Sequence, residues 1–94
     1  VTKIRKKSIE RKALIGKVEH YFTKAEIGQF LIENQELTVG DTILIVGPTT
    51  GEERLTLNKM MVNGQETTIA NSNEKMTMPL SFRVRKGDLL YKVL

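Results

Sequence analysis

Short apolar runs separated by closely spaced turn signals restrict the fold of this chain more than any other feature. From Leu14 onward, apolar and polar residues alternate with a period of two, and glycine, asparagine, aspartate or proline ends each run after a few residues. A period of two places alternate side chains on the two faces of a β-strand, whereas an amphipathic helix needs a period of about 3.6. The pattern therefore predicts an all-β domain.

The expected strands can be read directly from these runs. They cover residues 14–22, 27–33, 42–46, 54–62, 67–70, 76–82 and 89–93. Short strands at regular spacing are typical of a small barrel or sandwich, and closing the sheet removes its exposed edges. We therefore predict a small six- to seven-stranded β-barrel. Its core is expected to include Ile32, Ile43, Ile45, Leu57, Met78, Leu80 and Val93.

Two further features bear on this prediction. The methionines are expected to act as adaptable filling of the interior, because the thioether side chain is flexible; they are Met60, Met61, Met76 and Met78. Residues 4–14 are the one stretch that could form a helix, although their charge density favours a frayed arm equally.

The turns carry more information than the composition. Gly-Asp occurs twice directly before an expected strand, where glycine can adopt positive φ and aspartate can accept backbone N–H groups. Asn-Gly is the strongest short hairpin signal, because a type I′ turn needs positive φ at both central residues. The expected structural turn residues are Gly40, Asp41, Gly47, Pro48, Gly51, Asn63, Gly64, Gly87 and Asp88.

Positive charge is concentrated at the start of the chain. Six of the first twelve residues are basic and only Glu10 is acidic, although the whole chain of 94 residues carries only +4. A basic arm can neutralise phosphates of nucleic acid, whereas a solvated linker needs no ligand at all. The possible nucleic-acid contacts are Lys3, Arg5, Lys6, Lys7, Arg11 and Lys12. We therefore divide the chain into a basic linker or arm, 1–13, and a single barrel domain, 14–94.

The side-chain inventory argues against catalysis. The absence of cysteine excludes disulfides, zinc ribbons, iron–sulfur ligation and a thiol nucleophile. The single histidine, His20, is expected on the same strand face as Val18 and Phe22, which favours a packed or exposed role over a catalytic one. Glu52 and Glu53 are adjacent, so in a strand they point to opposite faces and cannot easily act as an acid and base pair. We expect no catalytic residue, no metal and no cofactor.

Length and hydropathy restrict the remaining possibilities. A chain of 94 residues has room for one domain. The longest aliphatic run, Ile43–Val46, is far shorter than the roughly 18 residues that span a bilayer. We expect no membrane association and a cytoplasmic location. Because the chain begins with Val1, we expect it to be processed or to be part of something longer.

Several of these motifs, taken in order, resemble the C-terminal domain of the collagenase-like peptidases, family U32. They are Ile15-Gly16-Lys17-Val18, His20-Tyr21-Phe22, the stretch from Leu37 through Gly40-Asp41 to Gly47-Pro48-Thr49-Thr50-Gly51, and Val84-x-x-Gly87-Asp88-x-Leu90-Tyr91-Lys92. The resemblance covers residues 14–94. It implies a barrel like domain II of elongation factor Tu, and small stand-alone proteins related to translation factors share the same turns.

The resemblance also implies a role. The presumed active centre of such proteins lies in a larger preceding domain, and none of its residues maps onto this chain. Some members are described as proteases, and others take part in RNA hydroxylation. We therefore expect a non-catalytic accessory domain that positions a polypeptide or RNA substrate, with the catalytic domain of the same parent chain as its partner. The alternative is a stand-alone RNA-binding module that uses the basic arm and one barrel face, where Tyr21 between Lys17 and Lys24 could stack on a base.

Overall fold

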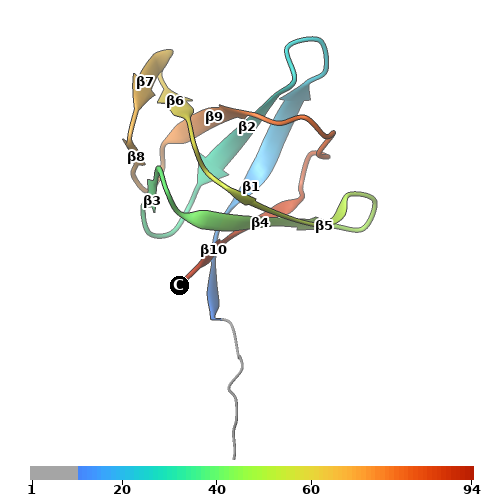
Figure 1. The fold of residues 1–94 in the computed structure, drawn as a ribbon, viewed down its shortest axis with the longest axis horizontal. Helices are drawn as coiled ribbons and strands as arrows, with labels where there is room; N and C mark the ends of the chain where they lie inside the picture. Colours follow the sequence, from blue (N-terminus) through green and yellow to red (C-terminus); the bar gives the residue numbers. More distant parts are fainter. Residues whose placement is uncertain (1–10) are drawn as a thin grey trace, which may run out of the picture.

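The computed structural model describes residues 11–94, which form ten β-strands and no helix (Figure 1). The all-β class is therefore confirmed. The strands are β1 (Lys12–Phe22), β2 (Ile27–Ile32), β3 (Leu37–Thr38), β4 (Thr42–Gly47), β5 (Gly51–Thr56), β6 (Met60–Val62), β7 (Gln65–Thr67), β8 (Ile69–Ala70), β9 (Lys75–Pro79) and β10 (Leu89–Val93). Lys12 and Ala13, which the sequence assigned to the linker, belong to β1.

Eight strands form one antiparallel sheet that curls around the core (Figure 1). Their order is β5-β4-β10-β1-β2-β9-β6-β7, and β3 pairs separately with β8. Within residues 11–94 no pairing joins β5 to β7, so the hydrogen-bonded sheet does not close as the predicted barrel would. The sheet therefore has two end strands.

The strand count exceeds the prediction because two expected strands are divided and the short strand β3 was not predicted. The run 54–62 breaks at Leu57, whose side chain is buried while its N–H donates to the Asp41 carbonyl at 2.9 Å. The chain then crosses to β6, which pairs with β9 instead of β4. The run 67–70 likewise contributes to β7 and β8, which belong to different sheets. Strand β9 ends at Pro79, which has no N–H to continue the ladder.

The core lies on the concave side of the sheet. Six of the seven predicted core residues are at most 2% exposed, and the exception is Val93, which is half-buried. In β10 the core-facing residue is instead Leu90. Met60, Met76 and Met78 fill the interior as predicted, whereas Met61 is only half-buried. The alternation in β10 was correct, but its inner and outer faces were exchanged.

Two irregularities in β1 determine which of its side chains face outward. The pairing register shifts between Leu14 and Gly16 against β10, and between Val18 and His20 against β2. A bulge inserts one extra residue and so moves the following side chains to the other face. Val18 is consequently buried while His20 is exposed, so the expected shared face was wrong. Tyr21 points toward the core and donates its hydroxyl to the Leu80 carbonyl at 3.0 Å.

The two Gly-Asp turns have the same geometry. In the first, the Thr38 N–H donates to the Asp41 carboxylate at 2.9 Å, and Gly40 has φ of 103°. In the second, the Arg85 N–H donates to the Asp88 carboxylate at 2.9 Å, and Gly87 has φ of 92°. Because φ lies in the region that favours glycine, each turn uses glycine for its conformation and aspartate to bind the backbone.

Asp88 also connects two parts of the sheet. It is the buried polar residue of the described chain, 3% exposed, and it accepts a hydrogen bond from the Thr50 hydroxyl. A Cβ atom on Gly47 would collide with its carboxylate. The side chain therefore joins the β4–β5 turn, where Pro48 is exposed and Gly51 has φ of 80°, to the start of β10.

Three details of the fold remain: the Asn-Gly turn, the edge strand β5 and the stretch that was considered as a helix. Asn63 and Gly64 have φ of 54° and 77° and connect β6 to β7. Strand β5 ends the sheet and carries three consecutive charged residues, Glu52, Glu53 and Arg54. Of the predicted helix, residues 12–14 lie in β1, and residues 4–10 are outside the described part of the chain.

Candidate functional site

Two adjoining hollows open on the outer surface beside the turn that leads into β10. The larger has a volume of about 430 Å³ and is lined by Lys17, Val18, Glu19, His20, Gln29, Lys75, Lys86 and Gly87. The smaller, about 170 Å³, is lined by His20, Tyr21, Arg83, Val84, Arg85 and Lys86. Because both hollows include His20 and Lys86, we treat them as one feature and call it the basic groove.

Strand pairing brings the groove residues together from distant parts of the sequence. Lys17 pairs with Leu31, which pairs with Lys75, so both lysines lie on the same row of the sheet. The turn before β10 is tied to β1, because the Gly87 N–H donates to the Val18 carbonyl at 2.9 Å. This bond places Lys86 beside the exposed side of β1. The bulge at Glu19 then turns His20 toward the same surface.

Positive charge dominates the groove. Its lining contains five cations, Lys17, Lys75, Arg83, Arg85 and Lys86, and one carboxylate, Glu19. That carboxylate is already engaged: its Oε1 lies 3.7 Å from Lys75 Nζ and accepts a hydrogen bond from Gln29 at 2.9 Å.

The groove cations are largely uncompensated. Lys17 contacts Glu33 at 3.8 Å, and within residues 11–94 no ion pair engages Arg83 or Lys86. Cations without a partner raise the local concentration of anions at a surface. The groove is therefore suited to an anionic ligand with several negative charges.

An exposed aromatic pair lies at the groove. The rings of His20 and Phe22 meet edge to face, with centroids 4.5 Å apart and an interplanar angle of 75°. Phe22 is 43% exposed. Exposed aromatic rings beside a basic channel are the combination with which proteins bind single-stranded nucleic acid, because bases stack on the rings while cations contact phosphates.

The predicted nucleic-acid contacts lie elsewhere. Arg11 and Lys12 are at the opposite end of β1 from Phe22, and Lys12 Nζ lies 5.3 Å from the centre of the Tyr91 ring. The other predicted contacts, Lys3, Arg5, Lys6 and Lys7, fall outside the described residues. The structure therefore does not bring the described arm residues to the groove.

Sequence reasoning missed most of the groove. It pointed to Tyr21 as a stacking ring, but Tyr21 is half-buried against the core and Phe22 is exposed instead. The cluster Arg83-x-Arg85-Lys86 was visible in the sequence directly before a predicted turn. Lys75 gave no such signal, because it joins the cluster only through strand pairing.

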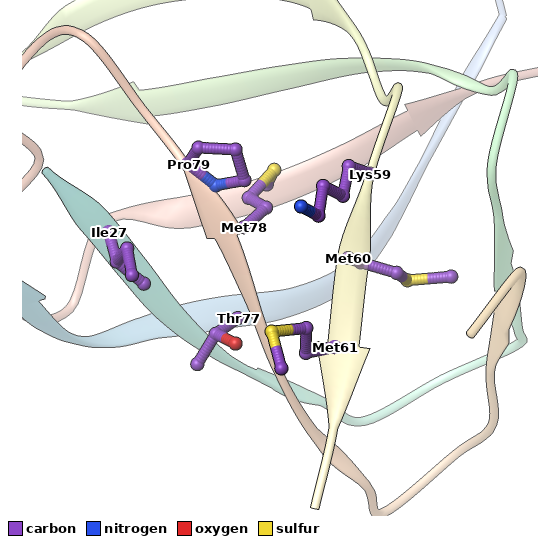
Figure 2. Close-up of a pocket in the computed structure, with 7 residues that line it drawn as sticks. All are labelled: Ile27, Lys59, Met60, Met61, Thr77, Met78 and Pro79. Carbon is purple, nitrogen blue, oxygen red and sulfur yellow. The ribbon is translucent and has the colours of Figure 1, made fainter. Parts of the chain in front are cut away.

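A separate, apolar pocket of about 130 Å³ lies where β6, β9 and β2 meet (Figure 2). It is lined by Ile27, Lys59, Met60, Met61, Thr77, Met78 and Pro79. Figure 2 shows Lys59 extending beside Met78 and Pro79, with Met61 below them. Its lining holds no carboxylate, histidine or serine, so it can accept a small apolar group but offers none of these side chains as a catalytic base.

Other kinds of site can be assessed for the described residues. Among residues 11–94, no three histidine, aspartate or glutamate side chains gather where they could hold a metal ion. The same part of the chain contains no helix with the length and apolar character needed to cross a membrane. The basic groove is thus the site with the most distinctive chemistry in the described structure.

Comparison of the sequence with curated proteins finds relatives among collagenase-like proteins. The chain is 35% identical over 81 residues to an uncharacterized protease of Methanocaldococcus jannaschii, covering 86% of this chain and 20% of the relative. It is 33% identical over 82 residues to a collagenase of Porphyromonas gingivalis, covering 87% of this chain and 23% of that protein. The chain thus spans about a fifth of the length of these relatives. No protein-family model matches it.

Comparison with solved structures finds the same fold in a separately crystallised domain. This is the C-terminal domain of a Geobacillus thermoleovorans protein assigned to peptidase family U32, with a TM-score of 0.78 over 84% of this chain and 90% of that domain, at 16% identity. Its selenomethionine form gives a TM-score of 0.77 over 83% and 96%. The structural match establishes the fold, and together with the sequence relatives it confirms the resemblance inferred from the motifs.

Proposed function

Because this chain is a homologue of the C-terminal domain of collagenase-like U32 peptidases, we propose that it is a non-catalytic accessory domain that holds a substrate strand for a catalytic region of the parent protein. Two observations support the accessory role. The chain corresponds to about a fifth of the length of its curated relatives. The comparable domain of the Geobacillus protein was crystallised alone, with 96% of it matched here.

The basic groove is the observation that carries substrate binding. Five cations and one carboxylate line it, and His20 and Phe22 present aromatic rings beside them. Single-stranded RNA offers a regular row of phosphates together with bases that can stack. A polypeptide offers such a row of negative charges only when it is strongly acidic. The chemistry of the groove therefore favours single-stranded RNA over a polypeptide as the strand that is held.

The binding mode follows from the residue types. Lysine and arginine side chains contact phosphates, and this contact releases condensed counterions and makes affinity fall with salt. The phenyl ring of Phe22 stacks on a base of any identity, because every base has an aromatic face. Phosphate contacts and stacking carry little sequence information. We therefore expect weak sequence preference, and we place the domain in the cytoplasm, where cellular RNA is abundant.

A finer fold assignment belongs to the same proposal. We infer that the domain is a barrel of the translation-protein type, similar to domain II of elongation factor Tu. The curled sheet of eight antiparallel strands supports this assignment, although its hydrogen bonding is interrupted between β5 and β7 within residues 11–94. The all-β architecture and its turns are compatible with either parent activity, proteolysis or RNA modification.

A charge-reversal experiment tests RNA binding. Arg83→Glu with Lys86→Glu is compared with Arg11→Glu with Lys12→Glu, which changes the net charge by the same amount at the other end of β1. Binding of a fluorescent 12-nucleotide RNA of mixed sequence is followed by anisotropy at low salt. We expect the groove pair to weaken binding at least tenfold more than the control pair. A larger loss from the control pair would instead support a stand-alone module that binds through its basic arm.

Two further measurements test the rest of the proposal. If the wild-type chain binds a gelatin peptide and not RNA, the strand that it holds is a polypeptide. Cleavage of gelatin by the purified chain, abolished by His20→Ala, would refute the non-catalytic role. Within residues 11–94, no serine or threonine lines the hollows that contain His20 and could act as its activated nucleophile. We expect RNA binding and no cleavage.

A further inference from the structure

A second cluster of apolar side chains lies on the outer face of the sheet, opposite the core. It is formed by Leu14, Leu44, Val46, Leu89 and Tyr91, which we call the apolar patch. Strand register makes it continuous, because Tyr91 pairs with both Leu14 and Leu44, and Leu89 pairs with Val46. Leu44 is 1% exposed, although its neighbours Ile43 and Ile45 are the residues of β4 that face the core.

Two side chains of the apolar patch are exposed to solvent. Leu14 is 42% exposed and Leu89 is 37% exposed, which makes them two of the four large apolar residues that are exposed in the described chain. Neither side chain packs against the core. Contiguous exposed apolar surface with a polar rim is typical of protein interaction sites.

The position of the patch indicates what covers it. Strand β1 begins at Lys12, two residues before Leu14, and the Leu94 N–H donates to the Arg11 carbonyl at 2.8 Å. The start of β1, to which a preceding region of a parent protein would be joined, therefore lies beside the patch and next to the C-terminal residue Leu94 (Figure 1). The matched residues make up only 20% and 23% of the two curated relatives, so a parent protein of that size contains a large region outside this domain.

Tethering and charge both favour a partner in the same protein. A partner linked by a short segment has an effective concentration in the millimolar range, so a small patch is sufficient to hold it. Lys12 and Lys17 flank the patch on β1, where Lys12 contacts the Tyr91 ring. On β5, Arg54 pairs with Leu44 and Glu52 pairs with Val46, so the rim holds three cations and one carboxylate. A complementary surface would be apolar at its centre and acidic at its rim.

We propose that the apolar patch docks against an acidic-rimmed surface of the region that precedes this domain in the parent protein. The inference rests on the accessory role proposed above but is independent of RNA binding. Lys17 borders both the patch and the basic groove, since it pairs with Leu89 and also lines the groove. Docking through the patch would therefore bring the Lys17 side of the groove close to the catalytic region and leave Phe22, at the far end of β1 from Leu14, exposed.

Hydroxyl-radical footprinting tests the docking, using the 94-residue chain and the full-length parent protein under the same conditions. Oxidation rates of Leu14, Leu89 and Tyr91 are measured by mass spectrometry. Phe22 is the matched control, because it is 43% exposed and lies outside the patch. We expect at least fivefold slower oxidation of the three patch residues in the parent protein and an unchanged rate at Phe22.

A substitution in the parent protein distinguishes docking from other causes of protection. Leu14→Glu should restore rapid oxidation of Leu89 and Tyr91, whereas Phe22→Glu should leave them protected. Equal rates in the parent and in the isolated chain would overturn the proposal, and so would protection that survives Leu14→Glu. Protection in the isolated chain that increases with its concentration would also overturn it, since the occupant would then be a second copy. If Phe22→Glu abolishes RNA binding while Leu89 and Tyr91 stay protected, docking through the patch is independent of RNA binding in the groove.

Discussion

The basic groove and the apolar patch share strand β1 but present opposite chemistry. At the start of the strand, Leu14 is exposed next to Tyr91. Toward its end, His20 and Phe22 are exposed next to the cations of the groove. A charged groove can hold a flexible strand in many positions, whereas an apolar patch needs a partner of matching shape. One strand can therefore contribute to two different surfaces, because its bulges determine which side chains face outward.

The largest effect is expected at Asp88, which lies between the two regions. Asp88→Ala removes the acceptor for the Arg85 N–H and the Thr50 hydroxyl, and buried donors without acceptors cost about 1–3 kcal/mol each. We expect the free energy of unfolding, measured by urea denaturation, to fall by about 3 kcal/mol. The matched variant Asp41→Ala removes the same contact in the more exposed turn and should cost about 1 kcal/mol. Equal losses would show that Asp88 has no special connecting role.

The next largest effect separates stacking from apolar exposure. Phe22 and Leu14 are 43% and 42% exposed, so truncating either removes a similar exposed surface. Phe22→Ala should weaken RNA binding by about 2 kcal/mol, or roughly 30-fold, since a stacked base contributes about 1–3 kcal/mol. Leu14→Ala should change it less than about twofold, and Phe22→Trp should preserve it. Anisotropy titrations measure all three, and a loss in Leu14→Ala equal to that in Phe22→Ala would contradict the division into two regions.

A smaller effect is expected in the salt dependence of RNA binding. Each cation that contacts a phosphate of a single strand contributes about −0.7 to the slope of log affinity against log salt concentration. Lys86→Ala should therefore flatten this slope by about 0.7, and Lys12→Ala should leave it unchanged. If Lys12→Ala flattened the slope and Lys86→Ala did not, the RNA contact would lie at the start of β1, beside the patch, and not in the groove.

The smallest effect concerns the patch in the isolated chain. Leu14→Glu should change the free energy of unfolding by no more than about 0.5 kcal/mol, because substitutions at exposed positions rarely do more. Leu44→Ala, at a buried position of the same patch, should cost about 2 kcal/mol, the lower end of the range for buried leucines. Thermal and urea denaturation provide the measurement. A large loss from Leu14→Glu would mean that this leucine stabilises the domain itself and is not available to a partner.

Local sequence chemistry was sufficient to predict most of the strands and the turns of this fold. The continuous apolar run Ile43–Val46 forms a buried strand, and the Asn63-Gly64 pair adopts the positive φ values that its hairpin needs. These features depend on a few neighbouring residues, so they can be read without knowledge of the partner strands. The all-β class and most of the core followed from the same reasoning.

The surfaces could not be predicted in the same way, because they depend on register. A bulge is defined by two residues opposing one on the partner strand, and nothing within β1 alone marks Ile15 or Glu19 as the extra residue. This is why Tyr21 was considered as the stacking ring instead of Phe22. Lys75 joins the groove only because β2 lies between β1 and β9. The predicted barrel closure failed for a related reason, since pairing of the two end strands is a property of the whole sheet.

The open edge at β5 has a consequence for the behaviour of the domain in concentrated solution. An unpaired edge is a template on which another chain can add a strand, and this is how many β-proteins begin to aggregate. Along β5, however, Glu52, Glu53 and Arg54 follow one another. An incoming strand would have to leave these charges partly dehydrated or opposite like charges. The sheet can therefore remain unclosed at β5 without that edge being a ready template for an added strand.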